Sequence, residues 1–141
     1  KEETITRLGE SWTKGSVVLS WKHSKKGGSN FSDGHNVVIH EFSHQLDQAD
    51  GVADGTPILD KSSAYRDWGY VLGKEYDKLQ NRGKRDKRRA VLREYGATNE
   101  AEFFAVSSEA FFEKPKQMRK KHPDLFEELK AYYKIDPSEW Q

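Results

Sequence analysis

The segment VVIHEFSHQLDQADG, residues 37–51, contains two histidines four positions apart and a glutamate directly after the first. In an α-helix, positions four apart lie on one face, so His40 and His44 can direct both imidazoles at one point. In this pattern two histidines bind zinc, and the glutamate, here Glu41, is the general base for a water that the metal makes more acidic. The segment therefore predicts a catalytic zinc site on a helix, with hydrolysis as its chemistry.

A catalytic zinc ion usually has a third protein ligand, and Asp50 is a candidate because it lies six residues after His44. The turn that would bring Asp50 to the metal needs glycine at position 47, where this chain has Asp47. Asp47 shares the histidine face and is expected to accept a hydrogen bond from the N–H of a ligand ring; the alternative is a solvated aspartate. The other histidines lack helical partners and are expected at the surface: His23, His35 and His122.

Three further carboxylates lie in the helical segment NEAEFFAVSSEAFF, residues 99–112. Glu100 falls in the solvated first turn, where a negative charge favours the helix dipole. Glu102 and Glu109 share one face with small residues between them, which would let this helix pass close to another helix. Spacing alone leaves Glu102 and Glu109 equally open as the third ligand.

A strand and a helix are expected to position the motif. The segment GSVVLSW, residues 15–21, has the β-branched, apolar composition of a short strand, and residues 22–34 read as a loop. The strand is interpreted either as an edge that holds peptide substrate or as an ordinary core strand. The helix that follows is expected to be capped by Ser32 or Asp33 and to end at Gly51. Its apolar side is formed by Val38, Ile39, Phe42, Leu46 and Ala49.

The remainder of the chain is expected to be helical. Apolar residues recur at helical spacing within residues 62–81 and 98–112. Two shorter helices are expected to begin near Pro115 and Pro123, since proline suits a first helical turn. The predicted caps of the two longer helices are Ser62 or Ser63, and Thr98 or Asn99. The expected fold class is α+β, mainly helical, with a small β-sheet before the HExxH helix.

Composition limits the classes of function. The 141 residues are enough for one domain with a core, and the absence of cysteine excludes disulfides and thiolate zinc sites. A net charge of +1 gives no field that would select nucleic acid or a membrane surface, and the basic run at 82–89 reads as a solvated turn. No apolar run of about 18 residues and no signal peptide is seen, so the cytoplasm is the expected compartment. Since the chain starts at Lys1 without methionine, we interpret it as the C-terminal part of a longer protein.

Four segments resemble the Mlc titration factor A family of zinc metallopeptidases: RLGESW, GSVVLSW, DGHNVVIHEFSHQLDQADG and EYGATNEAEFFAVSSEAFFEKP. The resemblance covers nearly all of the chain and implies one zincin-like metallopeptidase domain with a gluzincin-like site. It implies that His40 and His44 are zinc ligands, that Glu41 is the catalytic glutamate and that Glu102 is the third ligand. The spacing from Tyr95 to Glu102 is similar to that in the catalytic domain of anthrax lethal factor, a more distant relative. This similarity implies that the Tyr95 hydroxyl stabilises an oxyanion.

The remaining expectations concern Glu109, the activity and the binding partners. Glu109 is expected to accept a hydrogen bond from a ligand histidine. The expected activity is that of an aminopeptidase-like zinc peptidase, with cleavage at a free amino terminus or at an internal bond left open. The alternative is a regulatory binding module with weak or vestigial peptidase activity, because the family takes its name from binding the repressor Mlc. Expected partners are therefore a peptide or protein substrate and a transcriptional repressor, with no nucleic acid and no membrane.

Overall fold

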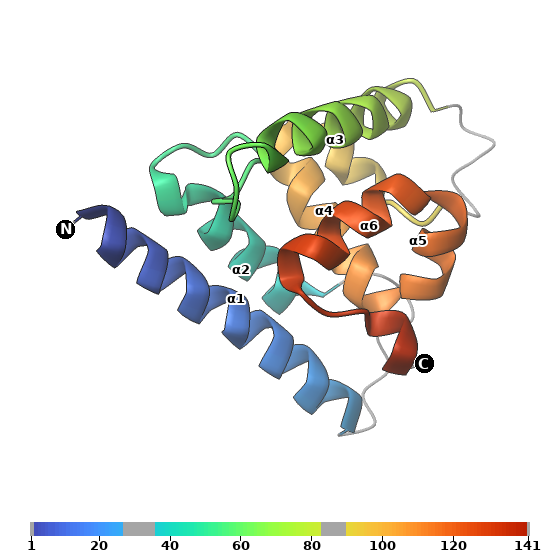
Figure 1. The fold of residues 1–141 in the computed structure, drawn as a ribbon. Helices are drawn as coiled ribbons and strands as arrows, with labels where there is room; N and C mark the ends of the chain where they lie inside the picture. The colour runs from blue at the N-terminus through green and yellow to red at the C-terminus, as the bar shows by residue number, and fades with distance from the viewer. Residues whose placement is uncertain (1, 27–35, 83–89, 141) are drawn as a thin grey trace.

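The protein is represented by a computed structural model that describes residues 2–26, 36–82 and 90–140. Helices pack around one central helix, α4 (Glu100–Glu113), which the other elements surround (Figure 1). Every side chain from Phe103 to the end of α4 is buried, as expected for a helix with apolar residues on all sides. The predicted cap is confirmed, because the Asn99 side chain accepts the N–H of Glu102 at 2.8 Å.

Helix α1 (Glu2–Lys26) includes the segment that was expected to be a strand. A strand would place residues 17, 19 and 21 on one face, but Val17 and Trp21 are buried while Leu19 is 69% exposed. The indole N–H of Trp21 donates to the carbonyl oxygen of Phe112 at 2.8 Å. Packing of this kind outweighs the local β preference of the Val-Val-Leu run. The predicted α+β fold with a small β-sheet is therefore wrong: residues 2–26, 36–82 and 90–140 contain helices and no strand.

Helix α2 (Val37–Asp47) carries the HExxH motif and packs against both α4 and α1 (Figure 1). Its N-cap is Asn36, whose side-chain oxygen accepts the N–H of Ile39 at 3.1 Å. The cap is therefore not one of the two residues expected from the sequence, Ser32 and Asp33, both of which lie outside the described residues.

The apolar side of α2 agrees with the sequence pattern in part. Ile39 and Leu46 are buried, but Val38 is 52% exposed and was wrongly expected to face the core. A 3-10 turn, η1 (Gln48–Asp50), continues the helix and ends at Gly51, whose φ is +92°. The prediction that Gly51 ends this element is confirmed, because glycine adopts this left-handed conformation readily.

The remaining elements pack against α4 or against one another (Figure 1). The expected helix at 62–81 is present, and the two shorter helices begin with proline in the first turn as predicted. Most of the predicted basic turn, residues 83–89, lies outside the described part of the chain. These elements are α3 (Ala64–Gln80), η3 (Glu94–Ala97), α5 (Pro115–Lys121), α6 (Pro123–Tyr133) and η4 (Pro137–Trp140).

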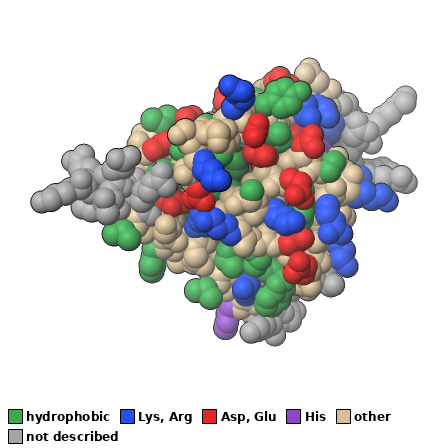
Figure 2. Space-filling model, viewed as in Figure 1, with side chains coloured by type: hydrophobic (Ala, Val, Ile, Leu, Met, Phe, Trp, Pro, Cys, Tyr) green, Lys and Arg blue, Asp and Glu red, His purple; other side chains and the backbone are tan. Residues whose placement is uncertain are grey.

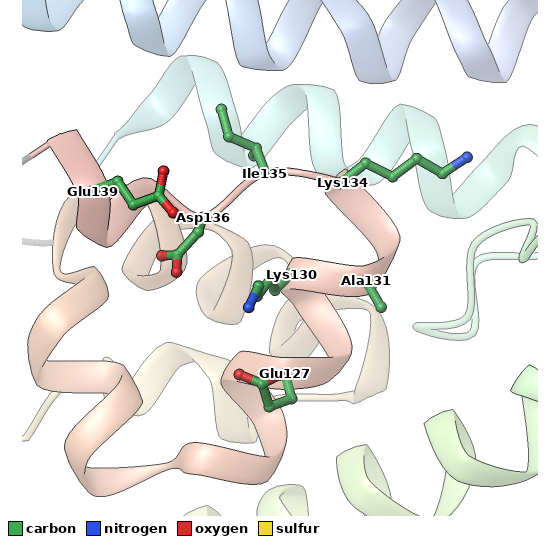
Figure 3. Close-up of a pocket in the computed structure, with 7 residues that line it drawn as sticks. All are labelled: Glu127, Lys130, Ala131, Lys134, Ile135, Asp136 and Glu139. Carbon is green, nitrogen blue, oxygen red and sulfur yellow. The ribbon is translucent and has the colours of Figure 1, made fainter.

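The surface carries charges of both signs. On the face shown in Figure 2, acidic and basic side chains are interspersed and do not gather into a patch of one sign. Within the described residues, no helix combines the length and apolar character needed to cross a bilayer. A cavity of about 580 Å³ lies at the end of α6 and beside η4 (Figure 3), and the histidines of the motif are not among its lining residues. Its lining side chains are Glu127, Lys130, Ala131, Lys134, Ile135, Asp136 and Glu139.

Candidate metal centre

Three candidate metal ligands meet where α2 packs against α4. Nε2 of His40 lies 2.9 Å from Oε1 of Glu102, and Nε2 of His44 lies 2.8 Å from the same oxygen. The two Nε2 atoms are 3.2 Å apart. All three side chains are half-buried, and each contributes one atom to a common triangle. These side chains keep 13%, 20% and 17% of their surface exposed for His40, His44 and Glu102, so solvent reaches the cluster; catalytic zinc sites likewise have three protein ligands and one position open to water.

The triangle is slightly smaller than the corresponding triangle of a tetrahedral zinc site. Bonds of about 2.0–2.1 Å in tetrahedral geometry place neighbouring ligand atoms about 3.3 Å apart. The observed separations of 2.8, 2.9 and 3.2 Å are all shorter than that value, by up to about 0.5 Å. Nδ1 of His40 faces the Glu109 carboxylate, so a proton on Nδ1 leaves the Nε2 lone pair directed at the triangle. Two imidazoles and one carboxylate are therefore a donor set that fits zinc.

Glu109 lies directly behind His40 and is completely buried. Its carboxylate accepts hydrogen bonds from the backbone N–H of Asn36 at 2.7 Å, from Nδ1 of His40 at 2.8 Å and from Nη2 of Arg93 at 2.6 Å. Burial acts to raise the Glu109 pKa, but these hydrogen bonds and the Arg93 charge outweigh burial and hold the pKa below its ordinary value. Glu109 is therefore ionised near neutral pH, and the hydrogen bond expected between it and a motif histidine is present.

Tyr95 approaches the triangle from η3. Its hydroxyl donates to Oε2 of Glu102 at 3.1 Å, and its ring centroid lies 6.0 Å from that of His40. The hydrogen bond to Glu102 and the charge of that carboxylate raise the Tyr95 pKa, so the phenol remains a donor at neutral pH. Gly96 allows η3 to pack closely, because a Cβ there would lie 3.2 Å from side-chain atoms of Leu79 and Val106.

Glu41 lies beside the triangle without taking part in it. Its side chain is exposed, and its charge contributes to the raised pKa of Tyr95. Glu41 directly follows His40 on α2, and its side chain faces solvent. A carboxylate that faces solvent beside a candidate metal site is placed to exchange protons with a bound substrate.

Asp47 does not have the role that the sequence predicted. It is completely buried, and its carboxylate accepts the backbone N–H of Gly55 at 2.9 Å and that of Asp54 at 3.2 Å. The φ of Gly55 is +81°, and a Cβ there would lie only 2.5 Å from the carbonyl oxygen of Glu100. The expected hydrogen bond from a ligand histidine is therefore replaced by contacts that tie the loop after α2 to the start of α4.

The other candidates for the third ligand lie outside the triangle. Asp50 accepts the N–H of Val52 at 3.1 Å within its own turn. The Glu100 side chain is exposed at the start of α4. Among the described residues, the group of potential metal ligands whose ligand atoms lie within 4.8 Å of one another is His40, His44 and Glu102.

The remaining histidines are distributed over other parts of the chain. His23 is exposed as expected, but it lies in α1 and not in a loop. His35 is outside the described residues. His122 was expected at the surface, but it is only half exposed and its Nδ1 lies 2.7 Å from Oε1 of the buried Glu75.

Sequence analysis missed two residues that hold Glu109, namely Asn36 and Arg93. The position of Asn36 directly before the motif helix was a usable signal, since asparagine is a preferred helix cap. No comparable signal existed for Arg93, because its contact with Glu109 joins a turn to a helix without any shared periodicity.

Comparisons with known proteins agree with a peptidase-like metal centre. A family model described as glucose-regulated metallo-peptidase M90 matches residues 1–134. The chain belongs to this metallopeptidase family, and the resemblance inferred from the sequence motifs is thereby confirmed. Such a family implies a bound metal ion, usually zinc.

Two relatives show how far the similarity extends. An uncharacterised protein of Synechocystis is 39% identical over 138 residues, which cover 97% of this chain and 50% of the relative. A protein named Mlc titration factor A from Salmonella typhi is 30% identical over 141 residues, which cover 97% of this chain and 51% of the relative. The chain thus spans about half the length of these curated relatives.

Proposed function

We propose that this chain is the catalytic domain of a zinc-dependent peptidase, with His40, His44 and Glu102 as the metal ligands. The observation that carries the proposal is the convergence of their three ligand atoms from two different helices, all within 3.2 Å of one another. The position of Glu109 behind His40 supports it, because metal-binding histidines usually donate their second N–H to a carboxylate or carbonyl.

Each residue around the triangle has a separate role in the proposed hydrolysis of a peptide. A zinc ion at this site would polarise the scissile carbonyl and lower the pKa of a water molecule from about 15.7 to about 7. The Glu41 carboxylate accepts the proton of the attacking water and delivers it to the leaving nitrogen. The Tyr95 hydroxyl turns from Glu102 to the substrate and donates to the carbonyl oxygen as negative charge develops there. Glu109 keeps the His40 ring in place throughout.

The substrate is proposed to be a peptide that is cleaved in the manner of an aminopeptidase. The name of the Salmonella relatives, Mlc titration factor A, supports a second candidate function, namely regulation by contact with a transcriptional repressor. The two functions differ in what they require of Glu41, because a binding module has no use for a general base.

The experiment compares Glu41→Gln with the parent protein, both loaded with zinc. The amide is nearly isosteric and can still hydrogen-bond water, but it cannot accept a proton. We expect Glu41→Gln to retain zinc while its hydrolysis of short peptides and aminoacyl anilides falls by about 10²–10⁴-fold. Glu127→Gln makes the same chemical change at an exposed position on α6 and should leave activity unchanged. A zinc-loaded parent that cleaves nothing in a broad peptide panel would favour the binding module, and equal cleavage by Glu41→Gln would disprove the role given to Glu41.

A further inference from the structure

Arg93 lies at the junction between the metal-binding helices and the turn that carries Tyr95. It is the residue that precedes η3, and its carbonyl oxygen accepts the N–H of Gly96 at 3.1 Å. Its Nη2 donates to Oε2 of Glu109 at 2.6 Å, and its guanidinium carbon lies 6.0 Å from the centre of the Tyr95 ring. The Arg93 side chain therefore lies next to both Glu109, which accepts a hydrogen bond from His40, and Tyr95, which donates one to Glu102.

The orientation of Glu109 depends on the donors around each of its oxygens. Oε1 accepts a backbone N–H, that of Asn36, whose position is fixed by the start of α2. Oε2 accepts from two side chains, Nδ1 of His40 and Nη2 of Arg93. A carboxylate removed from water needs both hydrogen bonds and a compensating charge. Arg93 supplies both, and its planar guanidinium has a more defined direction than an ammonium group would have.

We propose that Arg93 is a positioning residue of the metal centre, which fixes Oε2 of Glu109 and through it the ring of His40. This inference rests on the proposed function, because the His40 ring must be aimed at a metal for its orientation to matter. The same guanidinium lies 6.0 Å from the centre of the Tyr95 ring, so Arg93 also lies over the residue that carries the hydroxyl donor. Arg93 thus acts through other residues and has no contact of its own with the three ligand atoms.

A purely structural role for Arg93 makes different predictions. The ion pair with Glu109 joins the turn before η3 to α4, and its loss could lower stability without changing the metal site. Arg82 offers a matched control, because its Nη1 donates to the carbonyl oxygen of Leu92 at 2.7 Å and anchors the same segment one residue earlier. Neither of the contacts that define the proposal is made by Arg82.

The experiment measures cobalt(II) binding by the parent chain, Arg93→Met, Arg93→Lys and Arg82→Met. Affinity is taken from titration, ligand geometry from the visible absorption of the bound cobalt, and folding from thermal unfolding of each metal-free protein. We expect Arg93→Met to bind cobalt about 10–100-fold more weakly, with a changed spectrum, as when a hydrogen-bond partner of a metal ligand is lost. Arg93→Lys should show a smaller but measurable loss, since lysine restores the charge without the planar fork. Arg82→Met should match the parent in affinity and spectrum, even if it unfolds at a lower temperature.

The outcomes separate this inference from the proposed function. A parent that binds no cobalt or zinc would overturn the metal centre and this inference with it. If the parent binds cobalt and Arg93→Met binds it with the same affinity and spectrum, only the role of Arg93 is wrong. Equal losses in Arg93→Met and Arg82→Met would assign the effect to the segment as a whole. If Arg93→Met does not fold, Arg93→Lys decides, and parental affinity with a parental spectrum in that variant would overturn the inference.

Discussion

Removal of the Glu102 carboxylate tests the metal centre most directly. Zinc sites with four protein ligands bind with about 10–16 kcal/mol, which corresponds to about 2.5–4 kcal/mol for each ligand. Because about 1.4 kcal/mol equals a factor of ten, Glu102→Ala should weaken zinc binding by roughly 10²–10³-fold. Oε1 of Glu102 is the atom that both motif histidines approach, at 2.9 and 2.8 Å, and no other carboxylate of the cluster can replace it there.

Glu100→Ala is the matched control for this prediction. It removes the same charge from the same first turn of α4, but the Glu100 side chain is exposed and lies outside the triangle. Any general effect of charge on the helix dipole should therefore appear equally in both variants. Zinc affinity is measured by competition with a chelator of known affinity at fixed pH, after thermal unfolding has shown that each variant is folded.

Two results would refute this reasoning. If Glu102→Ala binds zinc as tightly as the parent, the triangle is not the metal site. Alternatively, Glu100→Ala or Asp50→Ala could lose as much affinity as Glu102→Ala, and the third ligand would then have been assigned to the wrong residue.

Two further predictions concern a hydrogen-bond donor and a buried ion pair. Tyr95→Phe should retain zinc but lose about 10²-fold in kcat toward peptides, as for removal of one oxyanion donor; an unchanged kcat would show that the hydroxyl has no role in the reaction. Burial acts to raise the Glu75 pKa, but the hydrogen bond and charge of His122 outweigh it and hold the pKa below the ordinary 4.5. The ionised Glu75 carboxylate therefore contributes stability that is present above about pH 4.5 and is lost as the pH falls through its folded-state pKa. Thermal unfolding between pH 3 and 7 should show Glu75→Gln less stable than the parent above pH 4.5, with the gap closing in acid; a gap that widens in acid would contradict the assigned pKa direction.

Much of the candidate site could be predicted from local sequence. His40 and His44 lie on one helix face because their spacing alone requires it, and the caps and prolines mark the helices that surround them. Helical spacing also placed Glu102 and Glu109 on one face, and the structure shows them at two depths, one in the triangle and one behind it. Depth along a shared face depends on how two helices pack, and sequence periodicity contains no information about that packing.

The failures have a common physical cause. Residues 15–21 have the composition of a strand, yet their conformation depends on a contact between Trp21 and Phe112, which are 91 residues apart in the chain. The Asp47 carboxylate likewise pairs with the backbone of a loop and not with the neighbouring histidine turn. In both cases the partner lies outside the element itself, 91 residues away for Trp21 and eight for Asp47, and local propensity cannot identify such a partner.

The contact between Asp47, Gly55 and the start of α4 affects how the molecule responds to zinc supply. It joins the end of one ligand-bearing helix to the beginning of the other through protein atoms alone. We expect this contact to hold the proposed ligands near one another before any ion binds, in contrast to small zinc domains whose folding is driven by the metal. Metal-free chains would therefore stay folded and able to bind zinc. The fraction of active molecules would then depend on the concentration of available zinc, and no unfolded intermediate would be needed for the metal to bind.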